Sequence, residues 1–322
     1  MHKVLLTDYA WADLDIERTI LQESNAELIV AEQKDPAALA RLAVDCSAIM
    51  TNWAKVPESV IAAAAGCKIV ARLGIGLDNI DVAAATRRGI VVTNVPDYCV
   101  IEVAEHALAL MLALSRKVAF YHYETKAGRY ELQAGPTLRR IEGQTLGIIG
   151  LGNIGRRFAQ KAVALGLKVL ATGRAPIPAS ELPPGVTWCD LNQLLAASDY
   201  ISLHVPLTPE TKNMLGAPQF ARMKPSAYLI NTARGGLIDH PALAEALTKG
   251  KLAGAALDVQ NAEPPDLTQP PFTDPRVIVT PHAAFTSVES LQNLRSRTAK
   301  QVAARLRGEV PESVVNPEVL RR

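Results

Sequence analysis

Short apolar runs rich in β-branched residues alternate with alanine-rich helical stretches along almost the whole chain. This alternation predicts parallel sheets covered by helices on both faces, because parallel strands are joined by a long crossover, usually a helix. The runs are almost continuously hydrophobic, which is typical of strands buried on both faces. The predicted strands form one series at 3–7, 27–31, 48–51, 68–73 and 90–93, and a second at 145–149, 167–171, 200–205, 227–231, 253–259 and 277–280.

Helical and polar segments divide the chain between these two series. A helical stretch over 102–117 and a polar loop over 127–143 separate them, and a last helix over 288–307 follows the second. A chain of 322 residues is roughly twice the usual size of one domain. We therefore predict an α/β fold of two Rossmann-like, doubly wound parallel-sheet domains with a cleft between them, the usual place for a ligand.

Composition excludes several other classes of protein. With 48% hydrophobic and 20% charged residues, the chain is not a disordered protein, a coiled coil or a collagen-like repeat. The net charge of +2 comes from interspersed charges of both signs, so neither nucleic acid nor a membrane is predicted as a partner. The four cysteines are widely spaced and predict neither a disulfide framework nor a metal site. Because Asp8 interrupts any signal-peptide core and the longest apolar stretch, 107–114, is short, we expect a cytoplasmic protein.

A glycine-rich turn opens the second series of strands. Residues 145–155 read TLGIIGLGNIG, with GxGxxG between a predicted strand and a helical stretch over 156–165. Gly150 permits a tight turn, Gly152 lets the main chain approach a pyrophosphate, and Gly155 allows close helix–strand packing. The N-terminus of the helix then offers free N–H groups to the anion. The turn predicts a dinucleotide site, and a glycine turn without a ligand is the alternative.

The end of the next strand indicates which dinucleotide is bound. A chain that binds NAD places Asp or Glu there for the ribose hydroxyls. Here residues 171–174 read ATGR, and no acidic residue occurs from 143 to 180. Gly173 stands in place of the acid and Arg174 follows it. Because a 2′-phosphate needs a positive donor rather than a carboxylate, we predict NADP, with NAD as second choice. The alternative is that Arg174 is a solvated loop residue.

Three ionisable residues follow the ends of strands in the second series. Arg234 follows 227–231, Glu263 follows 253–259, and His282 follows 277–280. The carboxyl ends of parallel strands meet at the edge where a dinucleotide binds, so these side chains are predicted to meet beside the nicotinamide. His282 can act as a general acid, Glu263 would favour its protonated form, and Arg234 offers a planar fork for a carboxylate. Taken singly, each could be an ordinary loop or surface residue.

These segments together resemble the D-isomer-specific 2-hydroxyacid dehydrogenase family over nearly the whole chain. The resemblance is carried by RLGIGLDNID at 72–81, NVPDYCVIEVAE at 94–105, the glycine turn, HVPLT at 204–208, NTARGG at 231–236 and PH at 281–282. It implies an NADP- or NAD-dependent oxidoreductase that reduces a 2-oxo acid to a D-2-hydroxy acid by hydride transfer. It also implies that Arg234, Glu263 and His282 are the catalytic trio, with His282 as acid/base.

The resemblance also implies a domain division, a partner and further site residues. The substrate domain would comprise 1–99 and 285–322, and the dinucleotide-binding domain would be inserted over 100–284. A homodimer would form through the cofactor domains, using the helix over 102–117 and the loop after it. The predicted cofactor site is Gly150, Gly152, Asn153, Ile154, Gly155, Gly173, Arg174, His204, Val205, Pro206, Thr211, Thr232, Ala233, Asp258 and Ala284. The predicted substrate site is Asn52, Trp53, Ile75, Gly76, Tyr98, Arg234 and Phe285.

Departures from the family pattern leave alternatives open. Most members carry Asp where Gly173 stands, and the TGR run looks like the NADPH-using glyoxylate and hydroxypyruvate reductases. Residues 97–105 and the run PHAAF at 281–285 are closer to the subgroup related to C-terminal-binding corepressors. We therefore predict a glyoxylate, hydroxypyruvate or bulkier 2-oxo acid substrate, with a dinucleotide-sensing interaction protein of weak or no turnover as the alternative. Glu263 argues against a formate dehydrogenase, and Ile75 argues against a phosphite dehydrogenase, which has lysine there.

Overall fold

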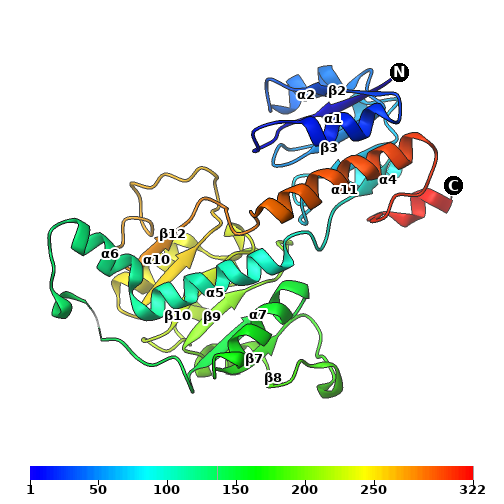
Figure 1. The fold of residues 1–322 in the computed structure, drawn as a ribbon. Helices are drawn as coiled ribbons and strands as arrows, with labels where there is room; N and C mark the ends of the chain where they lie inside the picture. Colours follow the sequence, from blue (N-terminus) through cyan, green and yellow to red (C-terminus); the bar gives the residue numbers. More distant parts are fainter. Residues whose placement is uncertain (136, 322) are drawn as a thin grey trace. The chain divides into compact units, whose positions relative to one another are not determined.

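The computed structural model describes residues 1–135 and 137–321, in two compact units of parallel sheet and helices (Figure 1). One unit is Met1–Tyr98 with Ser287–Arg322, and the other is Cys99–Thr286. In both sheets of the described chain, neighbouring strands pair in parallel, which confirms the predicted α/β fold of two doubly wound sheets. The function that we assigned to each domain remains a prediction.

The first unit contains a five-stranded sheet in the order β2-β1-β3-β4-β5. Its elements are β1 (His2–Leu6), α1 (Asp15–Gln22), β2 (Ala26–Val30), α2 (Pro36–Ala43), β3 (Ala48–Thr51), α3 (Glu58–Ala63), β4 (Ile69–Arg72), α4 (Val82–Arg87), β5 (Val91–Thr93), α11 (Val288–Leu306) and η4 (Pro317–Arg321). All residues of β3 and β4 are buried, as their continuous apolar runs predict. The helix α11 returns to α1, where Arg295 Nε lies 2.8 Å from Oε1 of the fully buried Glu17.

The second unit contains a seven-stranded sheet in the order β12-β11-β10-β9-β6-β7-β8. Its strands are β6 (Thr145–Ile149), β7 (Lys168–Thr172), β8 (Val186–Trp188), β9 (Tyr200–Leu203), β10 (Tyr228–Asn231), β11 (Gly254–Leu257) and β12 (Val277–Val279). Its helices are α5 (Val100–Arg116), α6 (Val118–Lys126), η1 (Leu132–Ala134), α7 (Asn153–Ala164), η2 (Ala179–Glu181), α8 (Leu191–Ala197), α9 (Ala217–Phe220), η3 (Gly235–Leu237) and α10 (His240–Thr248). The strand order reverses at β6, so a switch point lies between β6 and β9, where a dinucleotide binds in such sheets.

Successive residues of the central strands of this sheet enter two different cores. Ile148 packs with the core under α5 and α7, while Ile149 packs with the core on the other face. Ile230 and Leu229 on β10 are divided in the same way. This period of two, with both faces apolar, is why the strand runs read as continuously hydrophobic.

Two elements of the second unit were not predicted. The strand β8 has only three residues and follows Pro183, Pro184 and Gly185, which conceal it among turn signals. The helix α6 follows α5 after Lys117, whose φ of 54° is left-handed and interrupts the helix without a glycine. Within residues 1–135 and 137–321, no helix is both long enough and apolar enough to cross a membrane.

Candidate active site

The side chains of His282 and Glu263 meet beyond the ends of β12 and β11. Nδ1 of His282 lies 2.7 Å from Oε2 of Glu263. The other carboxylate oxygen, Oε1, accepts the main-chain N–H of Gln260 at 2.8 Å. The ring of Phe285 contacts the imidazole edge-on, with centroids 6.0 Å apart. The carboxylate is thus held by the main chain on one side and orients the imidazole on the other.

The environment of Glu263 keeps it ionised. Burial alone would raise the pKa of this carboxyl group. The hydrogen bond and charge of His282, the N–H of Gln260 and the charge of Arg234 outweigh burial and leave the pKa of Glu263 below its ordinary value. Glu263 is therefore a carboxylate throughout the neutral range, where it can stabilise an imidazolium at His282.

The main chain of His282 is left-handed and is held by Asp258. His282 has a φ of 55°, which an L-residue other than glycine rarely adopts. Its N–H donates to the main-chain oxygen of Asp258 at 2.7 Å. The fully buried carboxylate of Asp258 accepts the N–H groups of Ala283 at 2.9 Å and Ala284 at 3.0 Å. Asp258 thus fixes the turn that carries the imidazole; its predicted contact with a nicotinamide amide stays a prediction.

Arg234 lies on a turn that Asn231 closes at the end of β10. The side chain of the buried Asn231 donates from Nδ2 to the main-chain oxygen of Arg234 at 2.9 Å and accepts the N–H of Ala233 at 3.0 Å. A Cβ atom added to Gly235 would lie 2.0 Å from the carbonyl carbon of Gln260, so only glycine fits there. This close approach brings the Arg234 turn against the loop that leads to Glu263.

The glycine turn has the form that a phosphate group requires. Gly150 has a φ of 102°, and a Cβ there would lie 2.7 Å from the main-chain carbonyl of His204. A Cβ on Gly155 would lie 2.1 Å from the oxygen of Gly150, so both glycines are required by the protein's own packing. A Cβ on Gly152 would meet nothing within 4 Å. Gly152 therefore borders open space at the start of α7, whose first two residues are Asn153 and Ile154.

The loop after β9 lies against this turn. Nε2 of His204 lies 2.9 Å from Oγ of Ser202, and burial lowers the pKa of His204 to about 4, so its imidazole is neutral. Oγ1 of Thr211 donates to the oxygen of Pro206 at 2.7 Å and accepts the N–H of Thr208 at 2.8 Å. The loop that carries His204, Val205, Pro206 and Thr211 is thus braced internally beside Gly150.

Gly173 and Arg174 stand directly after β7. A Cβ on Gly173 would lie 3.2 Å from Cη2 of Trp188, which comes from β8. The hydrogen bond of Thr208 and, to a smaller extent, the charge of Arg174 lower the pKa of Glu210. Arg174 thus lies beyond the carboxyl end of β7, the neighbour of β6 in the sheet, on the side where the adenosine half of a dinucleotide lies in such sheets.

The predicted substrate residues of the first unit lie on two loops at the carboxyl edge of its sheet. The buried carboxylate of Asp8 accepts the N–H groups of Asn52 at 3.1 Å and Trp53 at 2.9 Å. The buried guanidinium of Arg72 donates from Nε to the oxygen of Gly76 at 3.0 Å. Asn94 donates to the oxygen of Ile75 at 2.8 Å, while Tyr98 is buried and Trp53 is 42% exposed. The structure thus braces both loops; their contact with a substrate stays a prediction.

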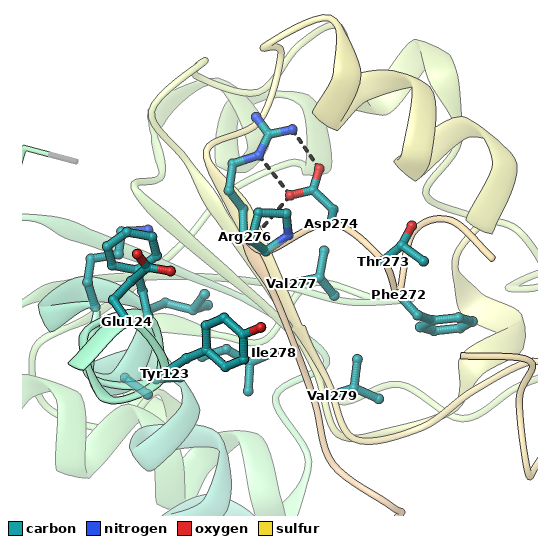
Figure 2. A pocket seen from close by; sticks show the side chains of 15 residues that line it. Tyr123, Glu124, Phe272, Thr273, Asp274, Arg276, Val277, Ile278 and Val279 are labelled. Carbon is teal, nitrogen blue, oxygen red and sulfur yellow. Dashed lines mark hydrogen bonds and ion pairs between the residues drawn. The ribbon is translucent and has the colours of Figure 1, made fainter. Parts of the chain in front are cut away.

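A groove of about 460 Å³ lies elsewhere on the second unit (Figure 2). It is lined by the end of α5, by α6 and by residues 272–279, with Tyr123 and Phe272 on opposite sides in the view. Ion-paired Asp274 and Arg276 form part of its wall. None of the three residues predicted to be catalytic, Arg234, Glu263 and His282, lines it.

Comparison with known proteins decides the family. The profile described as D-isomer specific 2-hydroxyacid dehydrogenase, NAD binding domain, matches residues 108–284. The chain belongs to the D-isomer specific 2-hydroxyacid dehydrogenase family. The resemblance noted in the sequence is therefore confirmed at the level of the family.

Individual relatives of this dehydrogenase family member carry several names. D-3-phosphoglycerate dehydrogenase of Methanocaldococcus jannaschii is 39% identical over 320 residues, which cover 98% of this chain and 60% of that protein. Glyoxylate reductase of Korarchaeum cryptofilum is 38% identical over 281 residues, 86% of this chain and 85% of that protein. The crystal structure of a glyoxylate reductase from Paecilomyes thermophila has a TM-score of 0.87 at 28% identity, covering 98% and 99% of the two chains. The chain thus spans less than two thirds of the first relative's length.

Several residues that brace the predicted site residues within one unit or the other were not predicted from the sequence of this dehydrogenase family member. They are Asp8, Arg72, Asn231, Trp188, Thr280 and His106. Asp8 and Arg72 lie at the carboxyl ends of β1 and β4, so the strand-end argument used for the second sheet would have found them in the first. Trp188 had no such signal, because its strand was not predicted.

Proposed function

We propose that the chain is a nicotinamide-dependent oxidoreductase that reduces a 2-oxo acid to a D-2-hydroxy acid. The observation that carries this proposal is the 2.7 Å contact between His282 and Glu263, on the sheet edge that also bears the glycine turn. A carbonyl that accepts hydride needs a proton at its oxygen, and an imidazolium held by a carboxylate supplies one. Membership of the family and the glyoxylate reductase relatives support the same chemistry.

The residues of the second unit fit a dinucleotide. The turn over 150–155 and the start of α7 would hold the pyrophosphate, since Gly152 borders open space there. The hydroxyl of Thr232 is buried and has no partner within the part of the chain that the structure describes, so a bound carboxamide or ribose could satisfy it. Thr232, Ala233 and Asp258 are our proposed contacts at the nicotinamide end.

Each member of the trio has one task in the proposed reaction. A reduced nicotinamide, when bound, supplies the hydride to the carbonyl carbon. His282 donates a proton to the carbonyl oxygen, and Glu263 stabilises the imidazolium before that transfer. Arg234 binds the carboxylate of the 2-oxo acid and turns its carbonyl towards His282. In the reverse direction, neutral His282 takes the proton from the hydroxyl group.

We also propose that NADPH is preferred to NADH. The β7 strand ends without a carboxylate, and Arg174 follows Gly173 where a 2′-phosphate would lie. The space beside Gly173 is limited by Trp188, so the main chain rather than a side chain faces the ribose there. Arg174 would then supply charge-assisted hydrogen bonds to the phosphate.

Substituting Gly173→Asp is expected to lower the ratio of kcat/KM for NADPH to that for NADH by about 10–100-fold. The added carboxylate repels a 2′-phosphate and offers hydrogen bonds to ribose hydroxyls. Because any Cβ at 173 meets Trp188 at 3.2 Å, Gly173→Ala is the matched control and should affect both cofactors equally. Initial rates at varied NADPH and NADH measure both ratios. An unchanged ratio in Gly173→Asp would contradict the proposed phosphate site.

The proposed partner is a second copy of the chain. The helix α6 presents exposed apolar side chains, with Val118 59% and Tyr123 70% exposed, and Tyr123 also lines the groove. Beyond α6, Tyr130 and Leu132 are 90% and 84% exposed. Apolar surface of this kind marks protein–protein contacts. Sedimentation equilibrium should give the mass of a dimer, and a monomer at micromolar concentration would contradict the proposal.

The test of the proposed function is the initial rate of absorbance loss at the reduced-nicotinamide band. NADPH and NADH are compared with glyoxylate, hydroxypyruvate, pyruvate, phenylpyruvate and 2-oxoglutarate. Oxidation of NADPH by one of these acids is the expected result, with glycolate as the achiral product from glyoxylate and the D-hydroxy acid as the product from the others. Measurable cofactor binding without turnover on any of them would contradict the proposal and favour a dinucleotide-sensing protein.

A further inference from the structure

The candidate acid/base sits on a turn that needs external support. A left-handed main chain is unfavourable for a residue with a Cβ atom, and His282 has a φ of 55°. The turn is held by the main-chain oxygen and the carboxylate of Asp258, which receive three N–H groups from His282, Ala283 and Ala284. The orientation of Asp258 therefore sets the position of His282.

Asp258 is itself oriented by Thr280. Oγ1 of Thr280 donates to Oδ1 of Asp258 at 2.6 Å, the shortest of the bonds that this carboxylate receives. Burial alone would raise the pKa of Asp258, but the hydrogen bonds from His106, Thr280, Ala283 and Ala284 keep it below its ordinary value. The buried group is thus a carboxylate that accepts hydrogen bonds from the hydroxyl of Thr280 and from the main chain of Ala283 and Ala284.

His106 completes this chain of hydrogen bonds from α5. Its Nε2 lies 3.2 Å from Oγ1 of Thr280 and 3.5 Å from Oδ1 of Asp258. Since the single hydroxyl proton of Thr280 goes to Asp258, the contact with His106 requires Nε2–H to donate to the hydroxyl oxygen. In its neutral form, His106 is therefore the tautomer protonated at Nε2. His106, a polar side chain on a helix whose buried residues are mostly apolar, thereby has a defined partner.

We infer that His106 is a positioning residue for the reaction, acting through Thr280 and Asp258 to hold the left-handed turn that aims His282 at Glu263. This inference rests on the proposed function for its effect on turnover. It places no part of α5 in contact with substrate or cofactor. A substitution of His106 or Thr280 should therefore lower the rate of the chemical step and increase the mobility of residues 281–286.

Thr280 offers a closely matched pair of variants. Thr280→Val keeps the branched volume but removes the hydroxyl, whereas Thr280→Ser keeps the hydroxyl. Thr280→Val should lower kcat about 10–100-fold, with KM for the nicotinamide changed less than about threefold. Thr280→Ser should stay within about threefold of the wild type, since the bond to Asp258 survives. If only the volume of the side chain mattered, Thr280→Val would instead stay active and Thr280→Ser would be the poorer variant.

His106 offers a second pair. His106→Gln places an amide N–H near the position of Nε2, and His106→Leu fills the space without a donor. His106→Leu should lower kcat in the same direction as Thr280→Val, and His106→Gln should retain most of the wild-type kcat. Because both side chains act on the carboxylate of Asp258, the double variant His106→Leu/Thr280→Val should lose less than the product of the two single losses. Multiplied losses in the double variant would contradict the inference.

Hydrogen–deuterium exchange gives a readout that does not depend on turnover. In Thr280→Val, peptides that cover residues 281–286 should exchange at least about tenfold faster, while peptides from α7 keep the wild-type rate. Should the wild type reduce no 2-oxo acid, the proposed function fails but the exchange result still decides whether the network holds the turn. The inference would be overturned if Thr280→Val, with a wild-type unfolding temperature, also kept the wild-type kcat and the wild-type exchange rate of the 281–286 peptides. If His106→Leu does not fold, the Thr280 pair alone decides.

Discussion

Replacing His282 with asparagine is expected to lower kcat for 2-oxo acid reduction by about 10²–10⁴-fold, the usual contribution of a general acid. The imidazole is the group that Glu263 orients at 2.7 Å, and no amide can donate a proton and be reprotonated in its place. Asparagine is preferred to alanine because His282 has a φ of 55°, which asparagine tolerates better than other residues with a Cβ atom. The variant therefore removes the acid with the least disturbance of the turn.

The measurement separates chemistry from binding. The dissociation constant of NADPH, measured by titration of tryptophan fluorescence, should change less than about threefold, while kcat falls. His122→Asn is the control, since His122 is an exposed histidine on α6. Parallel losses of kcat and cofactor affinity in His282→Asn would show that the residue organises the dinucleotide site rather than transferring a proton.

The strands were predictable wherever burial on two faces left a continuous apolar run. β3, β9 and β11 are buried over their whole length, and each was predicted within two residues at its ends. The strand β8 escaped because Thr187 is exposed and the run has three residues. The helix α6 escaped because it buries no residue, so its sequence lacks the apolar stripe that identifies a helix.

Topology made the residues of the candidate site predictable. The backbone conformation and the hydrogen bonds that hold them in place were not predictable from the sequence. The ends of β10, β11 and β12 lie side by side in the sheet, so residues directly after them had to come close. The left-handed backbone of His282 was not predictable, because residues 281–285 read PHAAF and contain no glycine that would indicate a positive φ. The partners of His106, Thr280 and Asp258, directly follow β12 and β11, far along the chain, so the sequence around His106 gives no indication of this contact.

Replacing Arg234 with lysine is expected to lower kcat/KM for a 2-oxo acid by about 10²-fold. Lysine keeps the charge but loses the planar fork, and a bidentate charge-assisted contact is worth about 2–3 kcal/mol more than what a single ammonium recovers. The turn itself should survive, because Asn231 holds it through the main chain of residues 233 and 234 rather than through the guanidinium. The loss should appear mainly in KM for the acid, with cofactor affinity unchanged.

A substrate without a carboxylate makes this prediction specific to Arg234. Wild-type protein should use glyoxylate far better than methylglyoxal, because only the acid engages the guanidinium. In Arg234→Lys the rate with glyoxylate falls, whereas the slow rate with methylglyoxal changes less than about threefold, so the preference for the acid shrinks. Equal losses on both substrates would mean that Arg234 acts through Glu263, whose pKa its charge helps to lower, and not through the substrate's carboxylate. The carboxylate would then have to be bound by other groups, of which the main chain of Ile75 and Gly76 is the first to test.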